Sequence, residues 1–292
     1  MSEIKKAILV IERDHEGIRF ENSDFSAEDE THLLTKVIVG NPMENFTKIM
    51  QFDDFMYFLH LHGNPEKAQI SVIRAPLDQL NDNIIFHNQV TILTDYVYRE
   101  SASNFKNKLP EFNEVCNVLK EYSGLENLLF TLFTNGPTVL LGNEIEIRNF
   151  IFDLLKLLPP KVAKLRTFIS YTDRLDNTID WVGLPSIQKS TSIISGLEFT
   201  HTIISIPKKR AVSAFECTLI NDLTQHIKNL DEENSLQMIS DIFSKSNIIR
   251  GEDDVTKIAD ILNCPLSDAQ FLKDVVKTHS LQEEDFNSLW RN

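Results

Sequence analysis

The stretch FTKIMQFDDFMYFLHLHGNPEKAQISVIR, from Phe46 to Arg74, holds three apolar runs separated by short polar turns. Its middle run, residues 55–62, alternates in the way a β-strand does, because successive side chains of a strand point to opposite faces. We therefore predict strands at residues 46–50, 55–62 and 69–74, with HGNPEK as the turn between the last two. Strands joined by such short turns pair antiparallel.

The residues before this stretch predict a hairpin and a helix. KAILVI (6–11) and IRF (18–20) flank DHEG, which is typical of a hairpin with Gly17 in its turn. Ser26 precedes the acidic residues 28–30, as at a helix N-cap, and the helix should stop near Gly40. The order is thus two strands, a helix and three strands, and a helical pattern follows over residues 83–122.

A second part of the chain begins after a plausible boundary at Ser123-Gly124. Strands alternate there with helices, which predicts a small, partly parallel sheet. Beyond Pro207 the pattern predicts only helices, with Asp254 and Ser267 at N-cap positions. The expected elements are a helix LENLLFTLFT, strand 138–142, helix 144–158, strands 165–171, 179–184 and 200–206, and helices 213–230, 233–245, 254–262, 267–279 and one ending near Trp290.

The charge balance disfavours general binding to nucleic acids. The chain has 292 residues, with 43 acidic against 29 basic residues and a formal net charge of −14, whereas phosphate backbones attract clustered Lys and Arg. The only compact basic run is Lys208-Lys209-Arg210. It suits a solvated loop after a strand, and the alternative is a contact with a small acidic partner or a phosphate.

The cysteines and the apolar runs predict a cytoplasmic protein. Cys116, Cys217 and Cys264 are widely spaced and fit no metal or redox motif, which favours reduced thiols. The apolar run after the N-terminus is too short for a signal sequence, and no apolar stretch approaches the roughly 18 residues of a membrane span. We expect no membrane insertion.

The segment TVLLGNEIEIR, from Thr138 to Arg148, has the strand–glycine–helix order of a phosphate-binding turn. It contains one glycine, and then Asn143, Glu144 and Glu146. Phosphate turns need several glycines and usually a Lys with Ser or Thr, and neither GxGxxG nor GK[ST] occurs here. Two carboxylates suit a helix start with no ligand, since they complement its dipole. We predict no cofactor.

The same region resembles the central core of DENN domains, especially those of the folliculin and Smcr-type proteins. The matching text is LLFTLFTNGPTVLLGNEIEIRNFIFDLLKLLPPKVAKLRTFISY, followed by IDWVGLPS. The preceding two-strand, helix, three-strand order resembles a longin domain, which those proteins carry ahead of the DENN core. The resemblance implies an α+β longin-like domain at 1–122, a DENN-like α/β core at 123–210 and a helical subdomain at 211–292. Prokaryotic GTPase-associated modules have segments similar to "LLPP…TFISY", so a prokaryotic or archaeal relative is the alternative.

What the longin–DENN resemblance implies is regulation or scaffolding of a small Ras-like GTPase, of Rab or Rag type, through protein–protein surfaces. Activating members place an arginine in a loop between longin strands. The corresponding turn here, residues 62–69, contains Lys67 but no arginine, and Arg74 lies beyond it at a strand end. Lys67 and Arg74 are therefore the catalytic candidates, and the alternative for both is ordinary surface charge. Lysine also lacks the bidentate fork of arginine.

Other functions remain open at this point. His60 and His62 lie on one face of a strand, as a metal pair requires, but no third ligand is fixed nearby, so we predict no metal site. No G-x-S-x-G elbow presents a nucleophile. The alternative to GTPase regulation is a GTPase-independent adaptor in trafficking, formed by longin-mediated pairing with another longin protein or with itself. An unrecognised enzyme is the third possibility.

Overall fold

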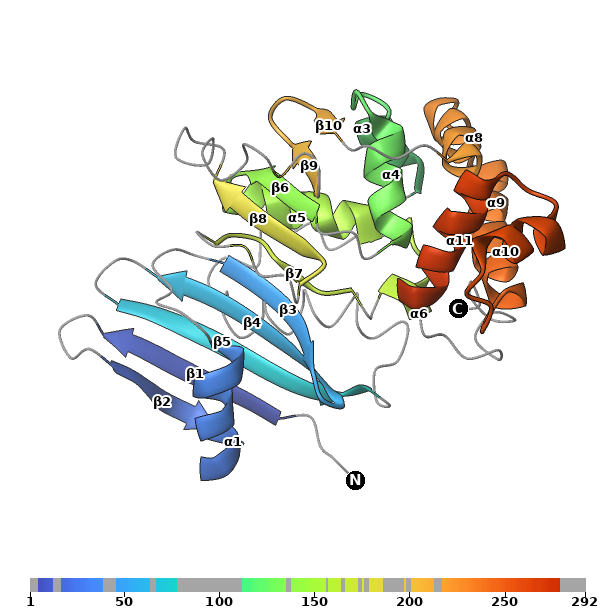
Figure 1. Cartoon of the computed structure of the whole chain (residues 1–292). Helices are drawn as coiled ribbons and strands as arrows, with labels where there is room; N and C mark the ends of the chain where they lie inside the picture. Colours follow the sequence, from blue (N-terminus) through green and yellow to red (C-terminus); the bar gives the residue numbers. More distant parts are fainter. Residues whose placement is uncertain are drawn as a thin grey trace. The chain divides into compact units, whose positions relative to one another are not determined.

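The computed structural model describes residues 5–12, 17–38, 46–63, 67–77, 112–134, 138–155, 157–163, 166–172, 175, 179–185, 197, 201–212 and 217–278. Over these residues the chain is a mixed α+β structure (Figure 1). It divides into two compact units. The first comprises residues 1–108, 143–148 and 164–185, and the second comprises residues 109–142, 149–163 and 186–292.

The first unit contains the predicted hairpin and the three predicted strands in one sheet. Its strands are β1 (Lys5–Glu12), β2 (Gly17–Ser23), β3 (Phe46–Phe52), β4 (Phe55–Gly63) and β5 (Lys67–Pro76). They pair antiparallel in the order β3-β4-β5-β1-β2. Two strands from later in the chain extend this sheet beyond β3: β7 (Phe168–Ile169) pairs antiparallel with β3 and parallel with β8 (Trp181–Pro185).

The predicted helix after the hairpin is confirmed, with a change of geometry halfway. It starts as α1 (Ala27–His32) and continues as the π-helix η2 (Leu33–Val37). Ser26 is the N-cap, as predicted, because its hydroxyl accepts a hydrogen bond from the Asp29 N–H at 3.2 Å. The π-helix closes with an Ile38 N–H donating to the Leu33 carbonyl at 2.9 Å.

The central strand β4 of the sheet in the first unit is buried on both of its faces. The face that α1 and η2 cover carries an apolar cluster in which Leu9, Leu59 and Leu33 of η2 are fully buried. On the opposite face, Met56 and Phe58 of β4 are almost fully buried as well. The alternation in β4 is therefore real, and both sets of alternating side chains are buried.

The second unit contains a parallel pair of strands and one strand that the sequence did not predict. Strand β6 (Thr138–Gly142) pairs parallel with β9 (Thr202–Ser205), which agrees with the predicted partly parallel arrangement. Strand β10 (Arg210–Val212) pairs antiparallel with β9, so the prediction of helices alone after Pro207 is wrong. With three residues, β10 is too short to show an alternation, and its pairing with β9 creates it.

The described helices after Cys217 confirm the predicted helical region. The ring of Phe133 packs against two rings of these helices: its centroid lies 5.7 Å from that of Phe243 and 6.0 Å from that of Phe271. Several helices of this unit are seen side by side in Figure 1. The described helices of the unit are α3 (Phe112–Leu119), α4 (Leu125–Phe133), α6 (Pro160–Ala163), α8 (Thr218–Lys228), α9 (Glu232–Ile248), α10 (Val255–Leu262) and α11 (Leu266–Thr278). Helix α5 (Glu144–Leu155) has residues in both units.

The predicted helix caps have different outcomes. Asp254 caps α10, because its carboxylate accepts from the Thr256 N–H at 2.9 Å. Ser267 does not cap α11, since the helix already begins at Leu266 and Ser267 lies inside its first turn. The predicted last helix, near Trp290, lies outside the described residues.

The two compact units follow strand pairing rather than chain order. Residues 143–148 and 164–185 belong to the first unit, because β7 and β8 join the sheet at β3. The three predicted ranges, 1–122, 123–210 and 211–292, follow the order of the chain and stay a prediction.

Candidate functional site

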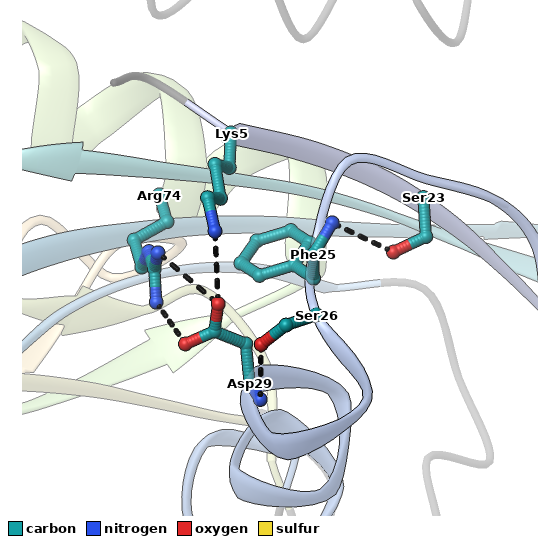
Figure 2. A network of polar contacts seen from close by, with 6 residues as sticks. All are labelled: Lys5, Ser23, Phe25, Ser26, Asp29 and Arg74. Atoms are coloured by element: carbon teal, nitrogen blue, oxygen red, sulfur yellow. Dashed lines mark hydrogen bonds and ion pairs between the residues drawn. The ribbon is translucent and has the colours of Figure 1, made fainter. Parts of the chain in front are cut away.

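Arg74, one of the two predicted catalytic candidates, is held inside the first unit by Asp29 of α1. Its Nη1 lies 2.7 Å from Asp29 Oδ1, and its Nη2 lies 3.5 Å from Oδ2. Lys5 reaches the same carboxylate from β1, with 2.9 Å between Nζ and Oδ2. Figure 2 shows both cationic side chains converging on the one carboxylate. We call Lys5, Asp29 and Arg74 the cation–carboxylate cluster.

The sheet register explains why the two cations meet. Lys5 of β1 lies directly opposite Arg74 of β5, and Tyr57 of β4 lies opposite Arg74 on its other side. Side chains at opposite positions on neighbouring antiparallel strands are about 5 Å apart at their Cβ atoms. Two cations placed in this way repel each other, so the shared carboxylate of Asp29 stabilises the pair.

Aromatic rings hold the Arg74 guanidinium from two directions. Its Cζ lies 4.5 Å from the centre of the Phe55 ring and 5.1 Å from that of Phe25. Cations are attracted to the faces of aromatic rings, and the attraction is stronger in a desolvated place. The Arg74 side chain is only 11% exposed. The guanidinium is therefore positioned by the rings as well as by the carboxylate.

The cluster changes the ionisation of its members. Hydrogen bonding to Arg74, and then to Lys5, holds the pKa of the Asp29 carboxyl well below its usual range, although partial burial acts in the opposite direction. Burial raises the pKa of the Tyr57 hydroxyl, and hydrogen bonding to Arg74 partly offsets this. Asp29 is thus ionised throughout the physiological pH range.

The other predicted catalytic candidate, Lys67, is the first residue of β5. The predicted loop of residues 62–69 is shorter than expected, since β4 extends to Gly63 and β5 begins at Lys67. The Lys67 side chain lies outside the described residues. Sequence reasoning did not single out Lys5 or Asp29 as partners of Arg74, because their meeting depends on the strand register.

A second polar network ties the loop after β7 to β3 and to the first turn of α5. The Thr47 N–H donates to Ser170 Oγ at 2.7 Å, and the Ser170 hydroxyl donates to the Glu144 carboxylate at 3.0 Å. Arg148 comes one helical turn after Glu144, and its Nη1 lies 3.4 Å from the same Glu144 oxygen. Ser170 is fully buried, so this network supports structure and offers no accessible nucleophile.

His60, a member of the predicted histidine pair, belongs to the edge of this network. Its Nδ1 lies 2.9 Å from the Thr47 hydroxyl, and the residue is 4% exposed. The His62 side chain lies outside the described residues. Across the described parts of the chain, no group of three or more His, Cys, Asp or Glu residues could hold a metal ion.

The start of α5 shows what the strand–glycine–helix segment does. The Asn143 side chain accepts from the Glu146 N–H at 2.9 Å, and the Glu146 carboxylate accepts from the Asn143 N–H at 3.1 Å. This reciprocal pair is a capping box, which satisfies the free N–H groups of a helix start within the chain. The carboxylates thus act at the helix terminus, as the sequence indicated.

The basic run Lys208-Lys209-Arg210 is exposed, as predicted for a loop, although Arg210 already belongs to β10. Lys209 has a positive φ of 47° and forms an ion pair with Glu121, which lowers the pKa of that carboxyl. The turn is also fixed by its backbone, since the Ser123 N–H donates to the Lys209 carbonyl at 2.9 Å. The pairing with Glu121 reduces the local positive charge.

Comparisons with known proteins add no family. No family model matches the chain, and no curated protein matches it. Among the described residues, no helix is both long enough and apolar enough to cross a lipid bilayer.

Proposed function

We propose that this protein regulates or scaffolds a small Ras-like GTPase, of Rab or Rag type, through its outer surfaces. The observation that carries the proposal is the order of elements over residues 5–76: two strands, a helix and three strands in one antiparallel sheet. That is the order implied by the longin-like resemblance. The DENN-like core and the helical end of the chain complete the proposed architecture.

Three of the described arginines are paired with carboxylates of the same chain. Arg74 is paired with Asp29, Arg148 with Glu144, and the buried Arg166 lies 3.9 Å from Asp180. Each of these arginines is committed to a carboxylate of the same chain. A protein can still regulate a GTPase by binding one nucleotide state more tightly than another, because differential binding shifts the equilibrium between the states.

The experiment is capture of this chain by immobilised GTPases of the Rab and Rag types in three states: GDP-bound, bound to a non-hydrolysable GTP analogue, and nucleotide-free. We expect capture to depend on the state. Preference for the nucleotide-free form indicates exchange activity, and preference for the GTP form indicates an activating or effector role. Equal capture in all three states, or none with either type, contradicts the proposal.

A second candidate function is a GTPase-independent adaptor that pairs with another longin-containing protein or with itself. Strand β2 favours it, since β2 is the terminal strand of its sheet and no described strand pairs with its outer edge. An open strand edge is a template for pairing with another chain. Light scattering measures this directly: a concentration-dependent dimer mass, or nucleotide-independent capture of another longin protein, supports this candidate over the first.

A further inference from the structure

Lys5 and Arg74 form a pair of cations that requires an anion. They lie at directly opposite positions on β1 and β5, where like charges destabilise a sheet. Both side chains turn toward the same point, where the Asp29 carboxylate accepts from each of them (Figure 2). The two cations come from strands of the sheet, whereas the carboxylate comes from α1.

The strands also supply neighbours of Arg74 other than Asp29. Phe55, which comes from β4, lies 4.5 Å from the Arg74 guanidinium, and Tyr57 of the same strand lies beside it in the register. A guanidinium packed on an aromatic face retains its orientation, because the ring attracts it independently of any counter-ion. The strands thus present a planar, oriented donor beside the Lys5 ammonium.

The first turns of α1 are weakly attached to the sheet. None of the residues Ala27–His32, all of which the structure describes, is buried. The apolar anchors lie at either side: Phe25 precedes α1, and Leu33 and Val37 belong to η2. Besides the Asp29 contacts, α1 has a ring contact between His32 and Phe52, with 4.8 Å between centroids, at its last turn.

The π-helix marks where the helix can bend. Short π-helical segments are rare and occur often at functional positions, and their hydrogen-bond pattern differs from that of the preceding α-turns. Here η2 follows α1 without a break, and its own end is held by buried side chains. The second half of the helix is therefore anchored by buried side chains that the first half lacks.

We propose that Lys5 and Arg74 form a carboxylate-binding site that Asp29 occupies within the chain, and that an acidic side chain of a partner protein replaces Asp29 there. Charge complementarity identifies the occupant. Asp29 shows that a carboxylate fits: Oδ1 faces Arg74, while Oδ2 faces Lys5 and the second Arg74 nitrogen. The inference goes beyond GTPase regulation, since it holds for any partner that presents a Glu or Asp.

The competition has a measurable consequence for affinity. A site that an internal group occupies for most of the time binds an external ligand more weakly by the fraction of time it is open. Suppose that Asp29 leaves the two cations free for about a tenth of the time. Removing the Asp29 charge should then tighten binding of a carboxylate ligand by about tenfold.

The test uses the peptide N-acetyl-tetraglutamate amide as the probe and the full chain. Asp29→Asn removes the internal anion with little change of shape. Glu28→Gln is the matched control, because it makes the same change of charge one residue away on the exposed side of α1. Asp29→Asn combined with Lys5→Gln removes one of the two cations. Binding is measured by isothermal calorimetry at low salt.

We expect D29N to bind the peptide about tenfold more tightly than wild type, E28Q to behave like wild type, and the double variant to lose most of the gain. Equal tightening in D29N and E28Q would mean general electrostatics and would overturn the proposal. Unchanged affinity in D29N would overturn it as well.

The wild-type chain gives an independent measurement in case D29N folds poorly. Millimolar peptide should speed hydrogen exchange of the amides of residues 27–32 and leave β5 protected, because the ligand favours the form in which α1 has moved. No change in exchange over that range of peptide concentration would contradict the proposal without any variant.

Discussion

Replacing Asp268 by Ala should expose how α8 is held, because this helix takes its N-terminal cap from another helix. Within the described chain, Cys217 at the N-cap of α8 makes no side-chain capping bond of its own. Instead, the Asp268 carboxylate of α11 accepts from the Thr218 N–H at 2.7 Å and from the Cys217 thiol at 3.3 Å. Asp268 itself is 2% exposed.

The magnitude follows from what Asp268→Ala leaves behind. Loss of an N-cap hydrogen bond costs about 0.5–2 kcal/mol. We expect the free energy of unfolding to fall by about 2 kcal/mol in D268A, because Asp268 is buried and accepts from both Thr218 and Cys217. Asp268→Asn keeps an oxygen acceptor and loses only the interaction of the charge with the helix dipole, so it should cost about 1 kcal/mol.

The assay is urea denaturation followed by far-UV circular dichroism, together with the rate at which a thiol reagent labels Cys217. Asp260→Ala is the control, because Asp260 is an exposed aspartate on the neighbouring α10. A D268A variant within about 0.5 kcal/mol of wild type, the range of ordinary surface substitutions, would refute the reasoning. A D268N variant as unstable as D268A would also refute it. In that case the charge of Asp268, and not its acceptor oxygen, would account for the stability of the wild-type chain.

Three further predictions concern other parts of the chain. The stability difference between wild type and D29N should be complete above the ordinary Asp pKa of 3.8. It should be lost progressively as the pH falls from that value toward the depressed pKa of Asp29 in the folded chain, and acid titrations of urea midpoints measure it. Gly183→Ala should lower the free energy of unfolding by more than about 3 kcal/mol, since a Cβ there would lie 2.1 Å from the Ser170 carbonyl oxygen. Gly251→Ala should cost only about 1 kcal/mol, because the space around Gly251 is open and only its φ of 86° is unfavourable for Ala. Thermal unfolding of the two variants ranks these costs. Cys264 should react first with a thiol reagent at pH 8, because burial raises the pKa of the Cys116 and Cys217 thiols to about 12. Mass spectrometry identifies the labelled sites, and an early adduct on Cys116 would contradict the prediction.

Local features of this protein could be predicted from the sequence because they involve residues a few positions apart. Ser26 caps α1 three residues on, and Asn143 and Glu146 cap α5 reciprocally. The alternation of β4 and the short turns around it predicted antiparallel strands, and the structure confirms them. Periodicity and capping depend on bonds within one turn of the chain, so the sequence shows them directly.

The contacts that build the candidate site depend on residues far apart. Asp29 meets Arg74 across 45 positions, and Thr47 meets Ser170 across 123. The strand register placed Lys5 beside Arg74, and the pairing of β7 with β3 brought residues 164–185 into the first unit. Such pairs form only when packing of the whole unit offsets the entropy of closing long loops. The sequence by itself therefore determined the longer elements and the caps at Ser26 and Asp254. The tertiary structure alone created the short strand β10 and decided which charges share one site.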